Sequence, residues 1–137
     1  MLPNIEVVSM NPVVHFEITA SDVTRAKEFY KKTFSWSLDD VPDMEYTIVR
    51  TTEVDSKRMP KEPGMINGGM MKKNAKIKNP VITINVINLD ESMQMIKKNG
   101  GKIIEDKQKV GDMGFSAYFQ DTEGNVMGLF QPSVKMQ

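Results

Sequence analysis

One order of elements occurs twice along this chain and limits what it can fold into. Residues 12–19 (PVVHFEIT) alternate apolar and polar side chains, as a half-buried strand does. Residues 21–34 (SDVTRAKEFYKKTF) follow with the spacing of an amphipathic helix. The β-branched stretch 79–88 and the helical pattern of 89–101 repeat this order. Because each helix offers one apolar stripe, each repeat can cover one face of a small sheet.

Further strands complete both repeats. Residues 56–64 contain two prolines and a glycine, which predicts a loop, and DTEGN at 121–125 predicts a tight hairpin with Gly124 in a left-handed turn position. Each repeat is thus a strand–helix–strand–strand–strand (βαβββ) module, and the two modules join within residues 72–79. The remaining strands are expected at 44–54, 65–73, 102–106, 115–121 and 125–131.

The expected fold class is α+β: two βαβββ modules that form a cup-shaped, curled mixed sheet with helices outside. A chain of 137 residues has the usual length of one domain, so we expect a single domain over residues 1–137. Module one takes about 8–73 and module two about 79–131. The sheet face that carries no helix must be covered by a second sheet, a second subunit or a ligand.

Composition excludes several classes of protein. Eighteen basic and eighteen acidic residues give a net charge of zero, without the basic excess typical of nucleic-acid binders. The absence of cysteine excludes disulfides and thiolate chemistry and fits a reducing compartment. The first twelve residues lack the features of a signal peptide, and no apolar run approaches the ~20 residues of a membrane span. We therefore expect a cytoplasmic protein without nucleic-acid or membrane partners.

The most informative polar residues lie on the first strand. His15 is the only histidine of the chain, and Glu17 follows two positions later on the same face. They could begin a metal site, line a ligand pocket or be ordinary strand residues. If the two side chains touch, the carboxylate should raise the pKa of the imidazole and make it a proton carrier near neutral pH.

Alternation also divides the faces of the two opening strands. Val14, Phe16 and Ile18 should pack beneath the first helix, which leaves His15 and Glu17 toward the cup. In the second module, Ile82, Ile84 and Val86 should face the helix, which leaves Val81, Thr83 and Asn85 toward the cup. A cavity with apolar walls and a few fixed polar groups is typical of small-molecule sites.

Three aromatic residues complete the candidate ligand site. Tyr46 and Tyr118 can contribute hydroxyls if they point into the cup. Trp36 either packs at the corner after the first helix or stacks on a ligand near the cup mouth. The chain has neither a Ser or Cys nucleophile at a recognisable spacing from His15 nor a dinucleotide-binding fingerprint.

Three stretches carry a resemblance to a known family: VVHFEITASDVTRAKEFYKKTFSW (13–36), VINLDESMQMIKKNGGKI (86–103) and FQDTEGNVMGLFQ (119–131). Their order and spacing resemble the vicinal oxygen chelate superfamily, which includes glyoxalase I, extradiol dioxygenases and bleomycin-resistance proteins. The chain is most similar to the small lactoylglutathione-lyase-related, or glyoxalase-like, proteins. The resemblance implies paired βαβββ modules that form a cup, often completed in a homodimer.

The resemblance also implies a divalent metal held by four side chains, two from each module. His15, seven residues before Asp22, matches the first ligand position. The other three positions fall near Gly69, Val81 and Gly128, none of which can coordinate a cation through its side chain. A metal is therefore disfavoured, and glyoxalase I activity with it, although Glu17 could serve as a substitute ligand beside His15.

Three functions stay open at this point. The first is a lyase-, isomerase- or dioxygenase-type enzyme that binds a small organic molecule in its cup and uses His15 and Glu17 as acid–base groups. The second is a non-catalytic protein that sequesters such a molecule, as resistance proteins do. The third is a regulatory or interaction module whose cup is filled by its own side chains.

Overall fold

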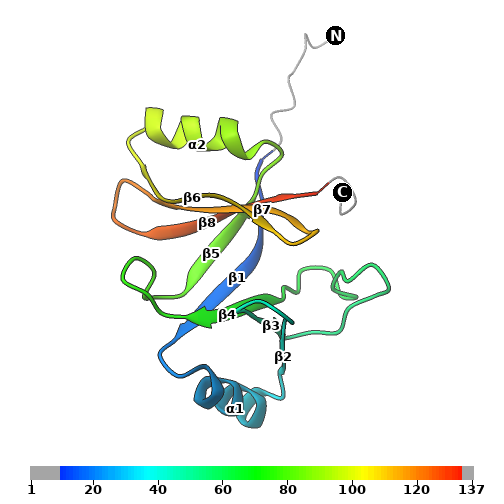
Figure 1. The fold of residues 1–137 in the computed structure, drawn as a ribbon. Coiled ribbons are helices and arrows are strands. Elements are labelled where there is room, and N and C mark those ends of the chain that lie inside the picture. The colour runs from blue at the N-terminus through cyan, green and yellow to red at the C-terminus, as the bar shows by residue number, and fades with distance from the viewer. Residues whose placement is uncertain (1–9, 134–137) are drawn as a thin grey trace, which may run out of the picture.

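Eight strands form one sheet that is flanked by two helices (Figure 1). The computed structural model describes residues 10–133, and residues 1–9 and 134–137 lie outside the described residues. Residues 1–9 include the expected start of module one and most of the stretch expected to lack a signal peptide. In chain order the elements are β1 (Val13–Ala20), α1 (Val23–Phe34), β2 (Ser37–Asp40), β3 (Thr47–Arg50), β4 (Gly68–Lys72), β5 (Val81–Asn85), α2 (Leu89–Lys98), β6 (Lys102–Val110), β7 (Gly114–Gln120) and β8 (Val126–Pro132).

The strand order is β2-β3-β4-β1-β5-β8-β7-β6, and the sheet is mixed. β1 runs parallel to β4, and β5 runs parallel to β8, whereas β1 and β5 are antiparallel where the two halves meet. The sheet curls without closing, and α1 and α2 lie at its two ends in Figure 1, with both halves of the sheet between them. The expected fold class is thereby confirmed, while the single-domain boundaries stay a prediction.

Local signals explain where the helices begin and end. Asp22 caps α1, because its carboxyl accepts a hydrogen bond of 3.0 Å from the backbone N–H of Arg25. Asn88 caps α2 in the same way through the backbone N–H of Glu91, at 3.0 Å. α1 ends at Ser35, which adopts a left-handed conformation with φ 61°. Ser21 and Asp22 are both residue types that can cap a helix, and the structure has Asp22 in this position.

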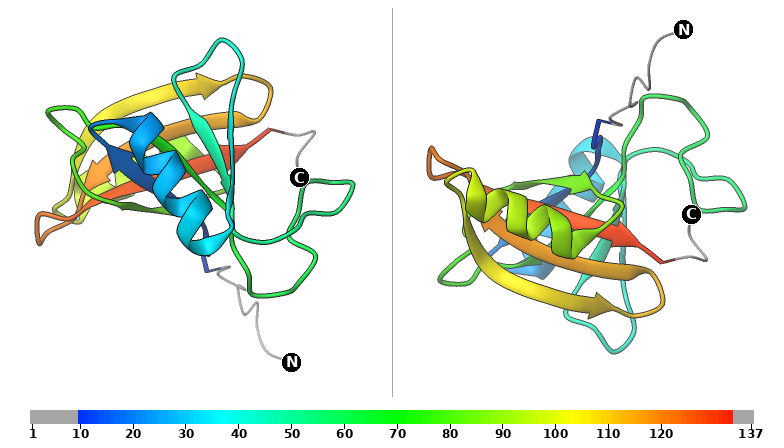
Figure 2. Two further views of the ribbon diagram at one scale, coloured as in Figure 1. Left: turned by 90° about the horizontal axis from the view of Figure 1, so that it is seen from below. Right: turned by 90° about the horizontal axis from the view of Figure 1, so that it is seen from above.

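Each helix closes one apolar core on the outer face of the sheet (Figure 2). Under α2 the core is centred on Leu89, which is fully buried, and Leu129. Under α1 it is centred on Val49 and Met70, both fully buried. Phe16 and Ile18 pack against this second core, so β1 turns these two residues toward α1 as the alternation predicted.

Two apolar residues expected under the helices, and one residue of α1, are exposed. Val14 of β1 and Ile82 of β5 are 39% and 47% exposed and do not belong to either core. Phe29 of α1 is 55% exposed and contacts Tyr30 and Phe34 rather than the sheet. The alternation sets the face of a residue but not how far the helix above it extends.

Strand lengths differ from those expected. Residues 44–54 were predicted as one strand, but β3 covers only Thr47–Arg50. β2, which the sequence did not indicate, pairs with β3 over all four of its residues. At its end, Asp40 also accepts hydrogen bonds from Lys27 Nζ at 3.0 Å and from Thr47 Oγ1 at 2.8 Å. These two bonds also lower the pKa of the Asp40 carboxyl, that from Thr47 most.

The second half follows the expected order more closely. β6 extends to Val110, beyond the predicted end at residue 106, and β7 and β8 occupy the predicted positions. The turn between β7 and β8 is confirmed, with φ 88° at Gly124 and Asp121 accepting the backbone N–H groups of Glu123 and Asn125. No helix within residues 10–133 is long and apolar enough to cross a membrane.

Candidate functional site

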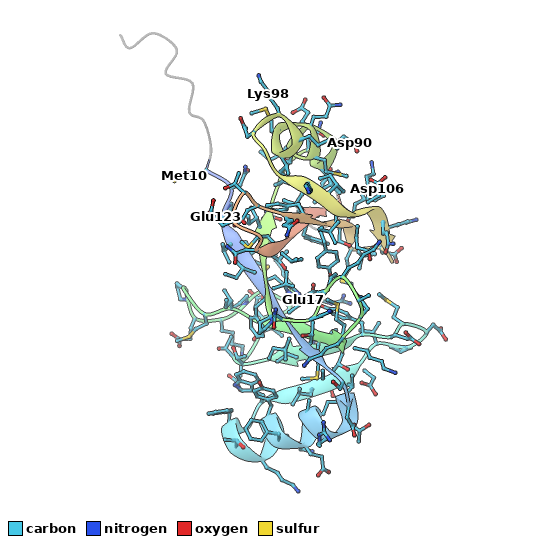
Figure 3. All side chains as sticks on the ribbon, turned by 90° about the vertical axis from the view of Figure 1, so that its left-hand side faces the viewer. Met10, Glu17, Asp90, Lys98, Asp106 and Glu123 are labelled. Carbon is cyan, nitrogen blue, oxygen red and sulfur yellow. The ribbon has the colours of Figure 1, made fainter. Side chains whose placement is uncertain are left out.

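The face of β1 that turns away from α1 carries the two polar residues singled out above. His15 and Glu17 alternate with Phe16 and Ile18, which pack toward α1. Glu17 is 6% exposed although it is an acidic residue, and it lies near the middle of the molecule (Figure 3). A carboxyl is seldom buried to this degree unless other groups hold it by hydrogen bonds.

Tyr118 of β7 holds this carboxyl from the other half of the sheet. Its hydroxyl donates a short hydrogen bond to Glu17 Oε1 and lies 3.8 Å from Met71 Sδ of β4. Alternation explains the direction of the tyrosine, because its neighbours Ala117 and Phe119 pack under α2. The bond therefore joins β1 of the first module to β7 of the second across the inside of the cup.

Tyr46 pairs with the histidine. Its hydroxyl lies 2.9 Å from His15 Nε2, and it immediately precedes β3, whose Val49 faces α1. The site thus contains two side-chain pairs, each formed by a residue of β1 and a tyrosine: His15 with Tyr46, and Glu17 with Tyr118. His15 and Glu17 are two positions apart on the same face of β1. The described contacts include no hydrogen bond between His15 and Glu17.

Burial dominates the electrostatics of these pairs. It lowers the pKa of His15, and the opposing effect of the Glu17 charge is smaller. Glu17 does raise the pKa of His15, as expected, but loss of water around the imidazole lowers it by more, so the net shift is downward and the imidazole is not a proton carrier of raised pKa. Burial also raises the pKa of Tyr46 and of Tyr118, and the charge of Glu17 and hydrogen bonds to it add to both shifts.

Gly69 and Gly128 have no side chain, and side chains of the site fill the space beside them. A Cβ atom on Gly69 would lie 1.7 Å from the Tyr46 hydroxyl oxygen, so the phenol occupies the volume of a side chain at this position of β4. A Cβ on Gly128 would lie 3.0 Å from Thr83 Oγ1. Thr83 is 6% exposed and pairs with His15 on one side and with Gly128 on the other.

These residues do not fit the divalent metal that the resemblance implies. Gly69, Val81 and Gly128 have no donor side chain, and the Tyr46 hydroxyl and Thr83 occupy the space beside the two glycines. Within residues 10–133, no group of three or more His, Cys, Asp or Glu side chains is placed to hold a metal ion. His15 and Glu17 alone offer fewer donor side chains than a divalent ion takes in a protein site.

The structure brings most of the expected site residues together, but not all. His15, Glu17, Tyr46, Thr83 and Tyr118 gather inside the cup, and Asn85 shares the face of Thr83 two positions further along β5.

Trp36 lies elsewhere. It stacks on Tyr30 with ring centroids 4.9 Å apart and packs with Phe16 in the core under α1. Trp36 therefore packs at the corner after the first helix, which was one of its two interpretations, and does not line the cup.

Sequence reasoning missed two members of the site. Met71 contacts the Tyr118 hydroxyl, and the charge of Glu105, opposite Tyr118 on β6, contributes to the raised pKa of that tyrosine. Alternation along β4 could have identified Met71, because it lies two positions after Gly69. Nothing local to β6 indicates the register that brings Glu105 opposite Tyr118.

The arrangement can hold and move a proton. A buried carboxyl, a neutral imidazole and two hydroxyls lie on the helix-free face of a sheet that curls around them. Groups of this kind act as general acids and bases when a substrate reaches them. Fold and site together define a curled sheet of two βαβββ modules whose helix-free face carries a cluster of one carboxyl, one imidazole and two hydroxyls.

Comparison with known proteins gives the family. A family model described as "bleomycin resistance protein-like N-terminal" matches residues 13–52. A glyoxylase-like domain-containing protein from Didymella fabae is 32% identical over 118 residues, which cover 82% of this chain and 88% of that protein. The chain belongs to the glyoxalase-like proteins of the vicinal oxygen chelate superfamily.

Solved structures agree on the fold. Methylmalonyl-CoA epimerase from Mycobacterium tuberculosis superposes with a TM-score of 0.62 and 15% identity, over 96% of each chain. A hypothetical protein from Bacillus halodurans gives 0.60 and 15% over 91% of this chain and 96% of its own. A methylmalonyl-CoA epimerase in complex with methylmalonyl-CoA and NH4+ gives 0.61 and 12% over 92% and 97%. At these identities the likeness establishes the fold alone.

The fit between Gly69 and Tyr46 predicts a strong coupling. Gly69→Ala should lower the free energy of unfolding by about 1–3 kcal/mol, because the new methyl group displaces the phenol. In a Tyr46→Ala background the same change should cost little, since the colliding ring is gone. Urea unfolding of the two single variants and the double variant measures this; equal costs of Gly69→Ala in both backgrounds would contradict the packing.

The lowered pKa of His15 predicts an acid-sensitive fold. Between the pKa of His15 in the folded chain and its ordinary value of 6.5, the unfolded chain binds more protons than the folded chain. The free energy of unfolding therefore falls as the pH falls through this window. The slope from this one group is at most about 1.4 kcal/mol per pH unit. Urea unfolding at pH 5.5 to 7.5 should show this dependence in the wild type.

His15→Gln should flatten the same profile, since no other histidine can titrate there. A profile unchanged by the substitution would contradict the assignment. Histidine NMR gives a direct check, because the single imidazole produces one titration curve.

Proposed function

We propose that this protein binds a small organic molecule in its cup and moves a proton on it, as a lyase- or isomerase-type enzyme without a metal centre. Glu17 and His15 are the acid–base groups in this proposal. The surrounding ligand contacts come from Tyr46, Thr83 and Tyr118, with Asn85 further along the same face. The observation that carries the proposal is the buried Glu17 carboxyl, which β1 and β7 hold together inside the cup.

A structural role alone would not require these polar groups. A carboxyl with 6% exposure costs free energy to bury even when it is hydrogen-bonded, and apolar side chains would fill the same space at lower cost. His15 is neutral near pH 7 because burial lowers its pKa, so it can accept a proton. A poised acid–base pair on the concave face is what proton transfer to and from carbon requires.

The fold neighbours suggest the class of molecule. Two of them are methylmalonyl-CoA epimerases, and one of these holds methylmalonyl-CoA. Epimerisation exchanges a proton on the carbon next to a carbonyl group, and the pair Glu17 and His15 has the functional groups for such a step. We therefore propose an enolisable carbonyl compound as the substrate class.

Non-catalytic sequestration is the second candidate. It is favoured by the match of residues 13–52 to the bleomycin-resistance-like model, and it uses the same cup without turnover. Dioxygenase chemistry stays a weaker alternative, because the donor set for a metal is missing. A homodimer, a cytoplasmic location and the absence of nucleic-acid or membrane partners likewise stay predictions.

Deuterium exchange tests the catalytic proposal. The protein is incubated in D2O with a panel of enolisable carbonyl compounds that begins with methylmalonyl-CoA, and exchange at the α-carbon is followed by NMR. The wild type should accelerate exchange of at least one compound. Glu17→Gln and His15→Ala should each lower the rate by about 10²-fold or more while thermal-shift titration still detects binding.

Glu123→Gln is the matched control and should leave the rate unchanged, because Glu123 is exposed on the turn between β7 and β8 and its side chain contacts Thr122. Binding without exchange by the wild type would favour sequestration. Neither binding nor exchange with any member of the panel would contradict both candidates and favour an interaction module.

A further inference from the structure

The two phenol hydroxyls beside Glu17 form a defined set of donors. Tyr118 donates to Glu17. The Tyr46 hydroxyl lies 2.9 Å from His15 Nε2 and beside Gly69, the β4 residue that pairs with Glu17. A hydroxyl has one hydrogen to donate, and it turns about the C–O bond without moving the ring. Both hydroxyls can therefore point at Glu17 or at another acceptor placed beside it.

The position of the negative charge determines which acceptor the two tyrosine hydroxyls bind. Glu17 is the carboxyl nearest to both hydroxyls: Tyr118 donates to it, and Tyr46 lies beside Gly69, its neighbour on β4. If Glu17 removes a proton from carbon, the carboxyl becomes neutral and the charge appears on the substrate. An oxyanion formed in a buried site needs preorganised donors, and without a metal the hydroxyls are the nearest candidates.

We propose that Tyr46 and Tyr118 form a two-hydroxyl site for a single negative charge, which lies on Glu17 at rest and on an oxygen of the bound molecule after Glu17 has taken up a proton. The proposal deepens the proposed function and rests on it. In this proposal the two tyrosine hydroxyls stabilise the charge that a metal ion would otherwise stabilise. The family's metal-ligand positions near Gly69, Val81 and Gly128 have no donor side chains in this chain.

The step balances without any further reactant. The C–H bond next to a carbonyl group breaks, and its proton forms an O–H bond with Glu17. The electron pair of the C–H bond forms the C=C bond of an enolate, and the carbonyl oxygen takes the charge. The net charge in the cup is unchanged, so the two hydroxyls only turn from the carboxyl to the enolate oxygen. Return of the proton to carbon reverses each change.

Glu17→Gln provides the test, because the neutral amide imitates in size and charge the carboxyl that has taken up a proton. The probes are 4-nitrophenolate, whose ionisation is visible in its absorption spectrum, and acetate as a smaller oxyanion. Glu17→Gln should bind at least one of them about tenfold or more tightly than the wild type, in which Glu17 repels the probe and keeps both hydroxyls.

Adding Tyr46→Phe or Tyr118→Phe to Glu17→Gln should each reverse the gain by about tenfold. The third tyrosine of the chain, Tyr30, is the matched control: it packs against Trp36 under α1, so Tyr30→Phe in the same background should leave the affinity unchanged. Circular dichroism and thermal unfolding verify that each variant is folded.

No gain for either probe in folded Glu17→Gln, or a gain that survives both phenylalanine substitutions, would overturn the inference. The two proposals fail separately. If the wild type binds or exchanges carbonyl compounds but Glu17→Gln shows no gain, the proposed function stands without this site. If Glu17→Gln gains affinity but the wild type binds and exchanges no carbonyl compound, the charge site stands without the proposed function.

Discussion

The hydrogen bond between Tyr118 and Glu17 is the interaction on which the inside of the cup depends. It joins strands from the two modules that are not neighbours in the sheet, since β5 and β8 lie between β1 and β7. A buried carboxyl that lost this partner would keep its desolvation cost without compensation, so the sheet must curl far enough to bring Tyr118 to it. The hydrogen bond between Tyr118 and Glu17 therefore depends on the curvature of the sheet, and it also determines the polar contacts inside the cup.

The same region explains how this chain departs from the metal-binding pattern that its family resemblance implies. His15 matches a ligand position, yet its imidazole contacts the hydroxyl of Tyr46, which fills the space beside Gly69. Gly69 on β4 has no side chain, and the ring of Tyr46, which precedes β3, fills the space that a side chain would take there. The result is a polar cluster in which each of two tyrosine hydroxyls contacts one residue of β1.

The fold and part of the site could be predicted from the sequence because they depend on local periodicity. The period of two on β1 put His15 and Glu17 on the face away from α1, and the Asp22 cap set the start of that helix. β2 could not be predicted, because only one of its four residues is apolar: Leu38, which packs against the core under α1.

The partners of the site residues depend on contacts distant in sequence, and here prediction failed in detail. Glu17 and Tyr118 are separated by 101 positions, and only the curl of the whole sheet brings them together. The pKa of His15 likewise could not be inferred from the nearby Glu17, since burial, a property of the assembled cup, has the larger effect. Trp36 had two interpretations because its sequence neighbours do not indicate whether it turns toward α1 or toward the cup.

The most direct test of the central claim is a double-mutant cycle between Glu17→Leu and Tyr118→Phe, measured by urea unfolding at pH 7. Each single change leaves one polar group without its partner, whereas the double variant removes both groups. The account predicts that the two changes are coupled by about 1.5–3 kcal/mol, as expected for a hydrogen bond to a buried charged group. Costs that add to within about 0.5 kcal/mol would contradict it, because the two modules would then be held together without this bond.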